Sequence, residues 1–291
     1  EYGCLPLKIA GESFLNEPLS KNIFPGRYPS MDLSGTRLLF QKNDSSGSSI
    51  SILNLKTGLI DTLLRNEDPH WYEHPTWYDK NHVIYGIRNS SGNYLYILDI
   101  RNKTSKALFN NEKLWGAIAD VSQDKKIVFA GYSKIDGHFT NPEIYFMEEL
   151  NSAPKQLTKT QSENWRPFFN GMQNSIYYIN HESGNFQVYS LDFSSPQSPN
   201  KITKSKLEHW DPVISIDGSL LSYAVKSGGN FDIWIEKIST NQHYKKRIIH
   251  SSENEWDPRF SPDSQYLLYA GTSPHGDQIR AICLNNYLSK D

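Results

Sequence analysis

Eleven charged, aromatic or imidazole side chains stand beside one short motif that recurs along the chain. The motif is clearest in its last two copies, HWDP at 209–212 and EWDP at 255–258, whose aspartates lie 46 positions apart. Carboxylates and imidazoles serve in acid–base catalysis, and arginine and aromatic side chains often anchor binding sites. The eleven residues are Arg27, Tyr28, Glu73, His74, Trp115, Trp165, Arg166, Trp210, Asp211, Trp256 and Asp257. A fold that brings the copies together would gather these side chains into one site.

The motif opens six similar lines of sequence. Their alignment points, with spacings of 46, 42, 50, 45 and 46, are Pro29, Pro75, Ala117, Pro167, Pro212 and Pro258. Each line continues with an apolar strand, a turn such as HESGN or KSGGN, and an alternating strand such as QVYSLDF. No stretch shows helical periodicity over a dozen residues. Four short strands in a repeat of this length predict an all-β, six-bladed β-propeller with four-stranded antiparallel blades.

We expect one domain spanning residues 1–291. The expected blades lie at about 25–66, 67–110, 111–158, 159–204, 205–250 and 251–291. The last blade lacks a fourth strand, so residues 1–24 should contain a closing strand, CLPLKIA at 4–10, and a connection. Such closure removes unpaired sheet edges. In that register Cys4 lies next to Cys283.

These lines resemble the TolB-type propeller repeat, also called the WD40-like or PD40 repeat. Its pattern is roughly Trp-x-Pro, two residues, Ser-Pro-Asp-Gly and an apolar strand. WDPRFSPDSQYLLY at 256–269 matches best, with Ser264 in place of the glycine, and WDPVISIDGSLLSY has Ile216 in place of the second proline. The resemblance covers about residues 25–291 and implies the fold. Members of this family include peptidase-gating domains, sensory domains, lyases, lactonases and TolB, which docks to a lipoprotein in the periplasm. The resemblance therefore leaves the function open.

The predicted site is one mouth of the central channel. In a propeller the loops that lead into the innermost strands ring this mouth, so the eleven side chains should converge there. The four tryptophans have an alternative role, which is packing between blades. Carboxylates beside His74 include metal-ligand types, but no chelating spacing is present, and the pair His70 and His74 lies in a proline-bounded loop. We therefore predict no metal and no cofactor.

Two properties narrow the partners and the location. The net charge of −2 indicates no nucleic-acid partner, and no apolar run is long enough for direct membrane insertion. Cys4 and Cys283 are either two buried thiols or a disulfide; we predict the disulfide, which implies an oxidising compartment. The chain begins with Glu1 and shows no signal peptide, as expected of a mature exported protein or of a domain from a larger one.

Together these features predict a non-catalytic binding module in the periplasm or another extracytoplasmic space. It would recognise a protein or peptide, or a small-molecule ligand, and it could be the sensor or interaction domain of a membrane-anchored protein. The alternative is an enzyme of the lyase or lactonase type. It would act on a sugar acid or lactone in the channel, with Glu73, His74, Arg166 and Asp257 as acid–base groups. No Gly-x-Ser-x-Gly nucleophile motif is present.

Overall fold

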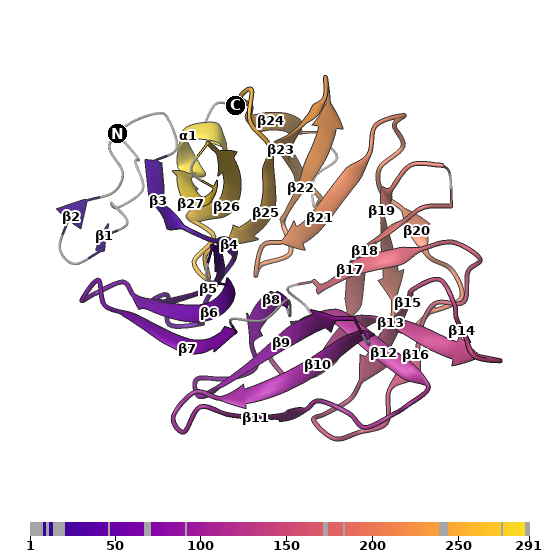
Figure 1. Ribbon diagram of the computed structural model, residues 1–291. Coiled ribbons are helices and arrows are strands. Elements are labelled where there is room, and N and C mark those ends of the chain that lie inside the picture. The colour runs from indigo at the N-terminus through magenta and orange to yellow at the C-terminus, as the bar shows by residue number, and fades with distance from the viewer. Residues whose placement is uncertain are drawn as a thin grey trace.

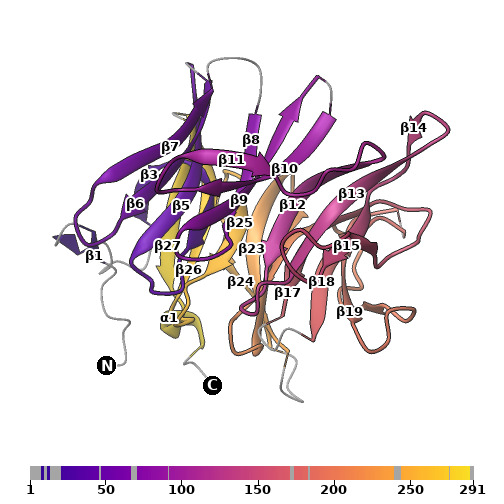
Figure 2. The same cartoon turned by 90° about the horizontal axis from the view of Figure 1, so that it is seen from below.

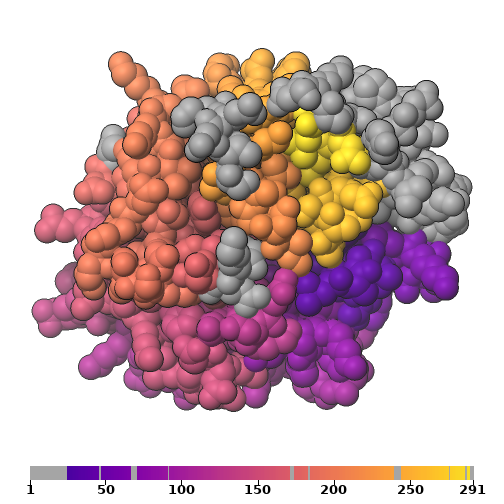
Figure 3. Space-filling model, turned by 180° about the vertical axis from the view of Figure 1, so that it is seen from behind, coloured from indigo at the N-terminus to yellow at the C-terminus, as the bar shows by residue number. Residues whose placement is uncertain are grey.

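Six antiparallel sheets stand radially around a central channel (Figure 1). This computed structural model describes residues 8–9, 12–13, 21–45, 47–66, 71–90, 92–170, 174–182, 184–238, 244–274 and 276–288. The blades follow one another around the ring in chain order, and Figure 3 shows the same ring from the opposite face. The predicted all-β, six-bladed propeller is confirmed.

Each blade starts with its innermost strand and continues outward. The first blade consists of β4 (Arg27–Met31), β5 (Arg37–Asp44), β6 (Gly47–Asn54) and β7 (Ile60–Asn66). The second consists of β8 (Trp71–Trp77), β9 (His82–Asn89), β10 (Gly92–Asp99) and β11 (Thr104–Ala107). The third consists of β12 (Leu114–Val121), β13 (Ile127–Ile135), β15 (Glu143–Met147) and β16 (Lys155–Gln156). The short β14 (His138–Phe139) extends the third blade by pairing with β13. All of these pairings are antiparallel, as the repeated turn signals require.

The remaining blades repeat the pattern. The fourth blade consists of β17 (Asn164–Phe169), β18 (Ser175–Asn180), β19 (Gln187–Asp192) and β20 (Asn200–Lys201). The fifth consists of β21 (His209–Ile214), β22 (Leu220–Ser227), β23 (Asn230–Lys237) and β24 (Lys245–Ile249). The sixth consists of β25 (Glu255–Phe260), β26 (Tyr266–Ser273), β27 (Gly276–Cys283) and β3 (Lys21–Pro25). In side view the strands run from one face of the ring to the other (Figure 2). The single-turn α1 (Asn285–Leu288) follows the last blade strand. No helix in the described part of the chain is both long and apolar enough to cross a membrane.

The sixth blade takes its outer strand from the start of the chain. β3 runs antiparallel to β27, with Pro25 opposite Gln278. The sequence predicts residues 4–10 in this position. Of these, only Lys8 and Ile9 are described, and they form β1, which pairs with β2 (Glu12–Ser13) instead. A strand that ends immediately before β4 needs no long connection, since Gly26 alone makes the corner and its N–H donates to the Asp277 carbonyl at 2.9 Å.

The predicted disulfide falls partly outside the described residues. Cys283 is buried at the end of β27, only 7% exposed, but Cys4 lies outside the described residues. The pairing of these two cysteines therefore stays a prediction.

The apolar core lies in the seams between adjacent blades. One cluster joins Leu39 and Ile50 of the first blade to Val83 and Leu98 of the second, and a similar cluster joins the fifth blade to the sixth. Alternation along each strand turns one set of side chains toward the preceding blade and the other toward the following blade. This packing is the reason why the second and third strands are apolar on both faces, and it holds the innermost strands around the channel.

Candidate binding site in the central channel

Every innermost strand carries a bulge at the same level of the channel. At each bulge the ladder register shifts and one residue has a left-handed backbone: Tyr28 (φ 51°), His74 (47°), Ile118 (50°), Arg166 (54°), Asp211 (53°) and Asp257 (52°). Residues other than glycine adopt positive φ rarely, and bulges redirect side chains. The repeat thus uses one strained backbone position in each blade to aim one side chain toward the channel.

Arg166 lies at the centre of this layer. Its Nη1 donates to Nδ1 of His74 at 2.9 Å and lies 3.5 Å from Oδ1 of Asp257. Its Nε lies 2.9 Å from Oδ1 of Asp211. Asp211 also accepts a hydrogen bond from the backbone N–H of Asp257 at 3.2 Å. One guanidinium from the fourth blade therefore contacts the second, fifth and sixth blades.

Arg27 forms the outer part of the same network. Its Nε and Nη2 donate to Oδ2 of Asp257 at 3.1 and 3.0 Å. Its guanidinium lies over two rings, 4.8 Å from the centroid of Tyr28 and 4.6 Å from that of Trp256. The Tyr28 ring in turn contacts the His74 ring, with centroids 3.7 Å apart and ring planes tilted by 39°. Arg27 is 23% exposed, so it joins the closed layer to the solvent-facing rim.

Burial controls the protonation of this layer. Burial, reinforced by the Arg166 charge, holds the pKa of His74 well below its usual range, so the imidazole is neutral and its Nδ1 can accept the Arg166 proton. Burial raises the pKa of Tyr28 to about 12. Burial also raises the pKa of Asp211, although Arg166 opposes this. The pKa of Glu73 is raised for the same reason and is opposed mainly by Arg88, whose Nη2 lies 3.0 Å from the Glu73 carboxylate.

Three of the predicted tryptophans pack against an aromatic ring of the preceding blade. Ring centroids lie 5.3 Å apart for Trp165 and Tyr132, 4.5 Å for Trp210 and Phe186, and 5.8 Å for Trp256 and Phe231. Such pairs add to the apolar burial in each seam. These indoles therefore contribute to blade packing, and Trp256 also contacts Arg27 in the rim.

The third blade departs from the expected alignment. Its bulge is at Ile118, so Ala119 and not Ala117 occupies the proline position, and the repeat spacings there become 44 and 48. Trp115 consequently lies three positions before the bulge residue, whereas the other tryptophans immediately precede theirs. Its ring lies 3.5 Å from Phe139 and 6.1 Å from Tyr94. Trp115 thus packs in the seam beside the second blade and does not flank a channel-facing residue.

The contacts of Arg166 bear on two alternatives for this site, metal binding and acid–base catalysis. Arg166 stands among His74, Asp211 and Asp257, where a metal ion would have to lie, and the described residues contain no group of three potential metal ligands. The acid–base candidates are likewise engaged: Glu73 with Arg88, His74 with Arg166, and Asp257 with Arg27. His70 lies outside the described residues. Side chains from four blades thus contact one another at this level of the channel, and Arg27 beside them remains partly exposed.

Two charged channel residues escaped the sequence analysis. Asp120 and Arg259 stand two positions after their bulge residues, where the other blades carry Ser30, Thr76, Phe168 and Val213. This repeat position is uncharged in the other four blades, so a single arginine and a single aspartate there could have been noticed in the sequence. Asp120 was missed because the third blade was aligned at Ala117, two residues before the position equivalent to the prolines.

A propeller of this kind has a counterpart among known families. Residues 74–289 match the family model described as PD40, the TolB beta propeller domain. Because the match covers well over half of the chain, the protein belongs to the TolB β-propeller family. No curated protein matches the chain.

Solved structures share the fold at low sequence identity. A putative TolB from Agrobacterium tumefaciens has a TM-score of 0.67 and 20% identity, with 83% of this chain and 87% of that chain covered. TolB from Acinetobacter baumannii has a TM-score of 0.66 and 21% identity, with 89% of this chain and 65% of that chain covered. A gluconolactonase from Xanthomonas campestris has a TM-score of 0.66 and 11% identity, with 91% and 87% covered. At these identities the likeness concerns the fold alone.

Proposed function

We propose that the protein is a non-catalytic binding module that recognises a protein or peptide at the channel mouth above the Arg166 layer. The carrying observation is that the charges in this layer neutralise one another, whereas side chains on the rim stay accessible. Arg27 is 23% exposed, Glu73 20% and Arg88 59%. Trp71, at the start of β8, is 45% exposed and lies opposite Arg88 in the ladder. Arginine and tryptophan are the residue types that most often anchor interfaces.

The proposed location is the periplasm or another extracytoplasmic space. A disulfide between Cys4 and Cys283 would fit an oxidising compartment. The structural likeness to TolB from two bacteria supports a binding role within the same class of propeller. The chain would serve as a sensor or interaction domain, and we include attachment to a larger membrane-anchored protein in this proposal.

An enzyme at the same mouth is the second candidate. A neutral imidazole beside a guanidinium is one specific observation in its favour, since Nδ1 of His74 accepts a hydrogen bond from Arg166 and the imidazole also contacts the Tyr28 ring. The fold likeness to a gluconolactonase points to lactones as the first substrates to try. Turnover of glucono-1,5-lactone by the wild type, lost in His74→Gln, would establish this candidate in place of the binding module.

The binding proposal is tested by changing the rim and leaving the buried layer intact. Wild type, the double variant Trp71→Ser/Arg88→Glu and the control Leu59→Ser would be immobilised and exposed to envelope extract. Leu59 is 71% exposed and lies in the turn between β6 and β7, outside the proposed face, so it controls for loss of exposed apolar surface. A partner retained by the wild type and by the control, but not by the double variant, is expected. Equal retention by all three would refute the proposed face.

A further inference from the structure

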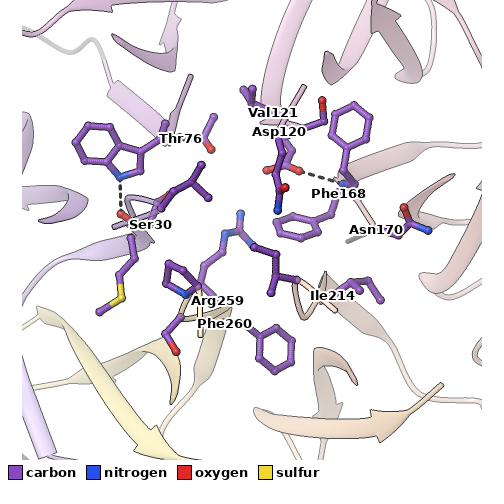
Figure 4. Close-up of a pocket in the computed structure, with 18 residues that line it drawn as sticks. Ser30, Thr76, Asp120, Val121, Phe168, Asn170, Ile214, Arg259 and Phe260 are labelled. Carbon is purple, nitrogen blue, oxygen red and sulfur yellow. Dashed lines mark hydrogen bonds between the residues drawn. The ribbon is translucent and has the colours of Figure 1, made fainter. Parts of the chain in front are cut away.

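A cavity lies at the other end of the channel, beyond the Arg166 layer. Its volume is about 190 Å³, and it is lined by the last residues of the innermost strands of all six blades and by the turns that follow. Figure 4 shows Arg259 extending toward the middle of this cavity, with Asp120 across from it. This end of the channel is separate from the rim proposed above as the protein-binding face.

Arg259 is the charged group that extends into the cavity. Its Nη1 donates to its neighbour's carbonyl, that of Pro258, at 3.2 Å, and its guanidinium lies 5.0 Å from the centroid of Phe168. No carboxylate in the described part of the chain forms an ion pair with it. Burial lowers the pKa of Arg259, but a guanidinium remains charged. A half-buried cation with unpaired N–H groups costs free energy unless something else satisfies it.

Asp120 faces the cavity but does not satisfy Arg259. Its Oδ2 accepts a hydrogen bond from the backbone N–H of Phe169 at 3.0 Å, which holds the carboxylate on the side of the fourth blade. Asp120 is only 8% exposed. The two charges therefore lie at the same cavity without direct contact, and Arg259 keeps donors directed toward open space.

We propose that this cavity binds the carboxylate of a small acid with an apolar body, with Arg259 as the anchor. The forked N–H groups of a guanidinium match the two oxygens of a carboxylate. Met31, Trp77, Phe168 and Phe260 supply apolar walls for the body. Pockets for drug-sized ligands measure roughly 300–1,000 Å³, so this smaller cavity suits an acid with a single ring.

Two sources share this chemistry: a free acid and the C-terminal residue of a peptide. Leu33 and Ile216 line the cavity and are 66% and 39% exposed. They would offer apolar contacts to the residues that precede a bound C-terminus. A free acid would need only the interior of the cavity.

The test uses calorimetric titration of the full chain with three probes: 3-phenylpropanoate, 3-phenylpropanamide and an acetylated tripeptide ending in phenylalanine with a free carboxylate. The wild type should bind a carboxylate probe at least about tenfold more tightly than the amide. Arg259→Gln should lose at least about tenfold in affinity, and Arg259→Lys should lie between the two. If the tripeptide binds more tightly than 3-phenylpropanoate and Leu33→Ser weakens its binding, the natural ligand is a peptide C-terminus. If the tripeptide and 3-phenylpropanoate bind equally, the ligand is a free acid.

Asp120→Asn separates a ligand contact from a purely structural role. Removing a like charge across the cavity should strengthen carboxylate binding severalfold, whereas general damage to the cavity would weaken it. This arm also stands if Arg259→Gln fails to fold. Failure of both acids to bind, equal affinity for acid and amide, unchanged affinity in Arg259→Gln, or weaker binding in Asp120→Asn would each overturn the proposal.

Discussion

Arg166 and His74 are 92 positions apart in the sequence, yet Nη1 of Arg166 donates to Nδ1 of His74 at 2.9 Å. The two residues belong to the fourth and second blades, which do not touch along a common seam in the ring. The same guanidinium contacts Asp211 and Asp257 in the fifth and sixth blades. Arg166 is therefore a crossbar of the channel, and the free energy of this contact depends on a ring that is fully closed.

Removing the crossbar should destabilise the whole ring. Arg166→Ala leaves Asp211 and Asp257 buried, 5% and 3% exposed, without the cation between them. Loss of one partner from a buried ionic network typically costs about 3–5 kcal/mol. Urea unfolding should show this as a lower midpoint with an unchanged slope.

The matched control is Lys226→Ala. Lys226 pairs with Glu208 at 3.6 Å on the surface, where the side chains are 50% and 32% exposed. Exposed pairs contribute little to stability, so a much smaller change is expected. An equal loss in the two variants would show that the crossbar adds nothing beyond a surface pair.

His74 should make the protein less stable in mild acid. Its folded-state pKa lies well below the ordinary value, so the unfolded chain takes up a proton that the folded chain refuses. Stability then falls as the pH drops below about 6.5, with a slope of at most about 1.4 kcal/mol per pH unit from this group. His74→Gln, whose amide oxygen can still accept from Arg166, should lose that part of the slope. Identical pH profiles for the two proteins between pH 7.5 and 5 would contradict a buried neutral imidazole.

Asp120 should act in the opposite direction. Burial raises its pKa to about 6, so the folded chain binds a proton more readily than the unfolded chain. Above pH 6 the buried carboxylate destabilises the fold, by at most about 3 kcal/mol for a rise of roughly two pKa units. Asp120→Asn should therefore raise stability at pH 8, and the gain should vanish below the unfolded-state pKa of about 3.9. A loss of stability at pH 8 would mean that the charged form is favoured.

The predicted disulfide is open to a direct chemical count. Thiol reagents applied to the unreduced, denatured protein should find no free thiol, and reduction should release two. In chain-entropy models a cross-link across such a long loop contributes up to about 5 kcal/mol, so reduction should lower the unfolding midpoint. Two reactive thiols before reduction would remove both the bridge and its support for an oxidising compartment.

The repeat made the six blades predictable because each copy carries the same turn residues and the same alternation. It also brought Arg27, Tyr28, His74, Arg166 and the paired aspartates to one place, since equivalent positions in a closed ring face one axis. Their burial was not predictable. A charged residue in one repeat is expected to lie on the exposed rim, because burial requires an opposite charge nearby. That opposite charge comes from another repeat, and the structure is needed to show which charges pair.

Local irregularities in the sequence explain the features that were predicted wrongly or missed. The third blade lacks its proline, so nothing in its sequence marked Ile118 as the bulge, and Trp115 misled the alignment. The predicted position of the closing strand was wrong because KNIFP carries only two adjacent apolar residues before its proline, with no alternation that would distinguish a strand from a loop. Arg259 was not predicted because it follows its proline, whereas the predicted site residues all precede the proline position of their repeat.

The pairing of β3 with β27 also has a kinetic consequence. Pro25 meets Gln278 across about 250 intervening positions, so β3 can pair only after the much later strand β27 has been synthesised. Until then the sixth blade keeps an open edge and the Arg166 crossbar lacks Asp257. Contacts of such high sequence separation slow folding. Ring closure should thus be a late event, and the interval before it is when the chain is most open to pairing with another copy of itself.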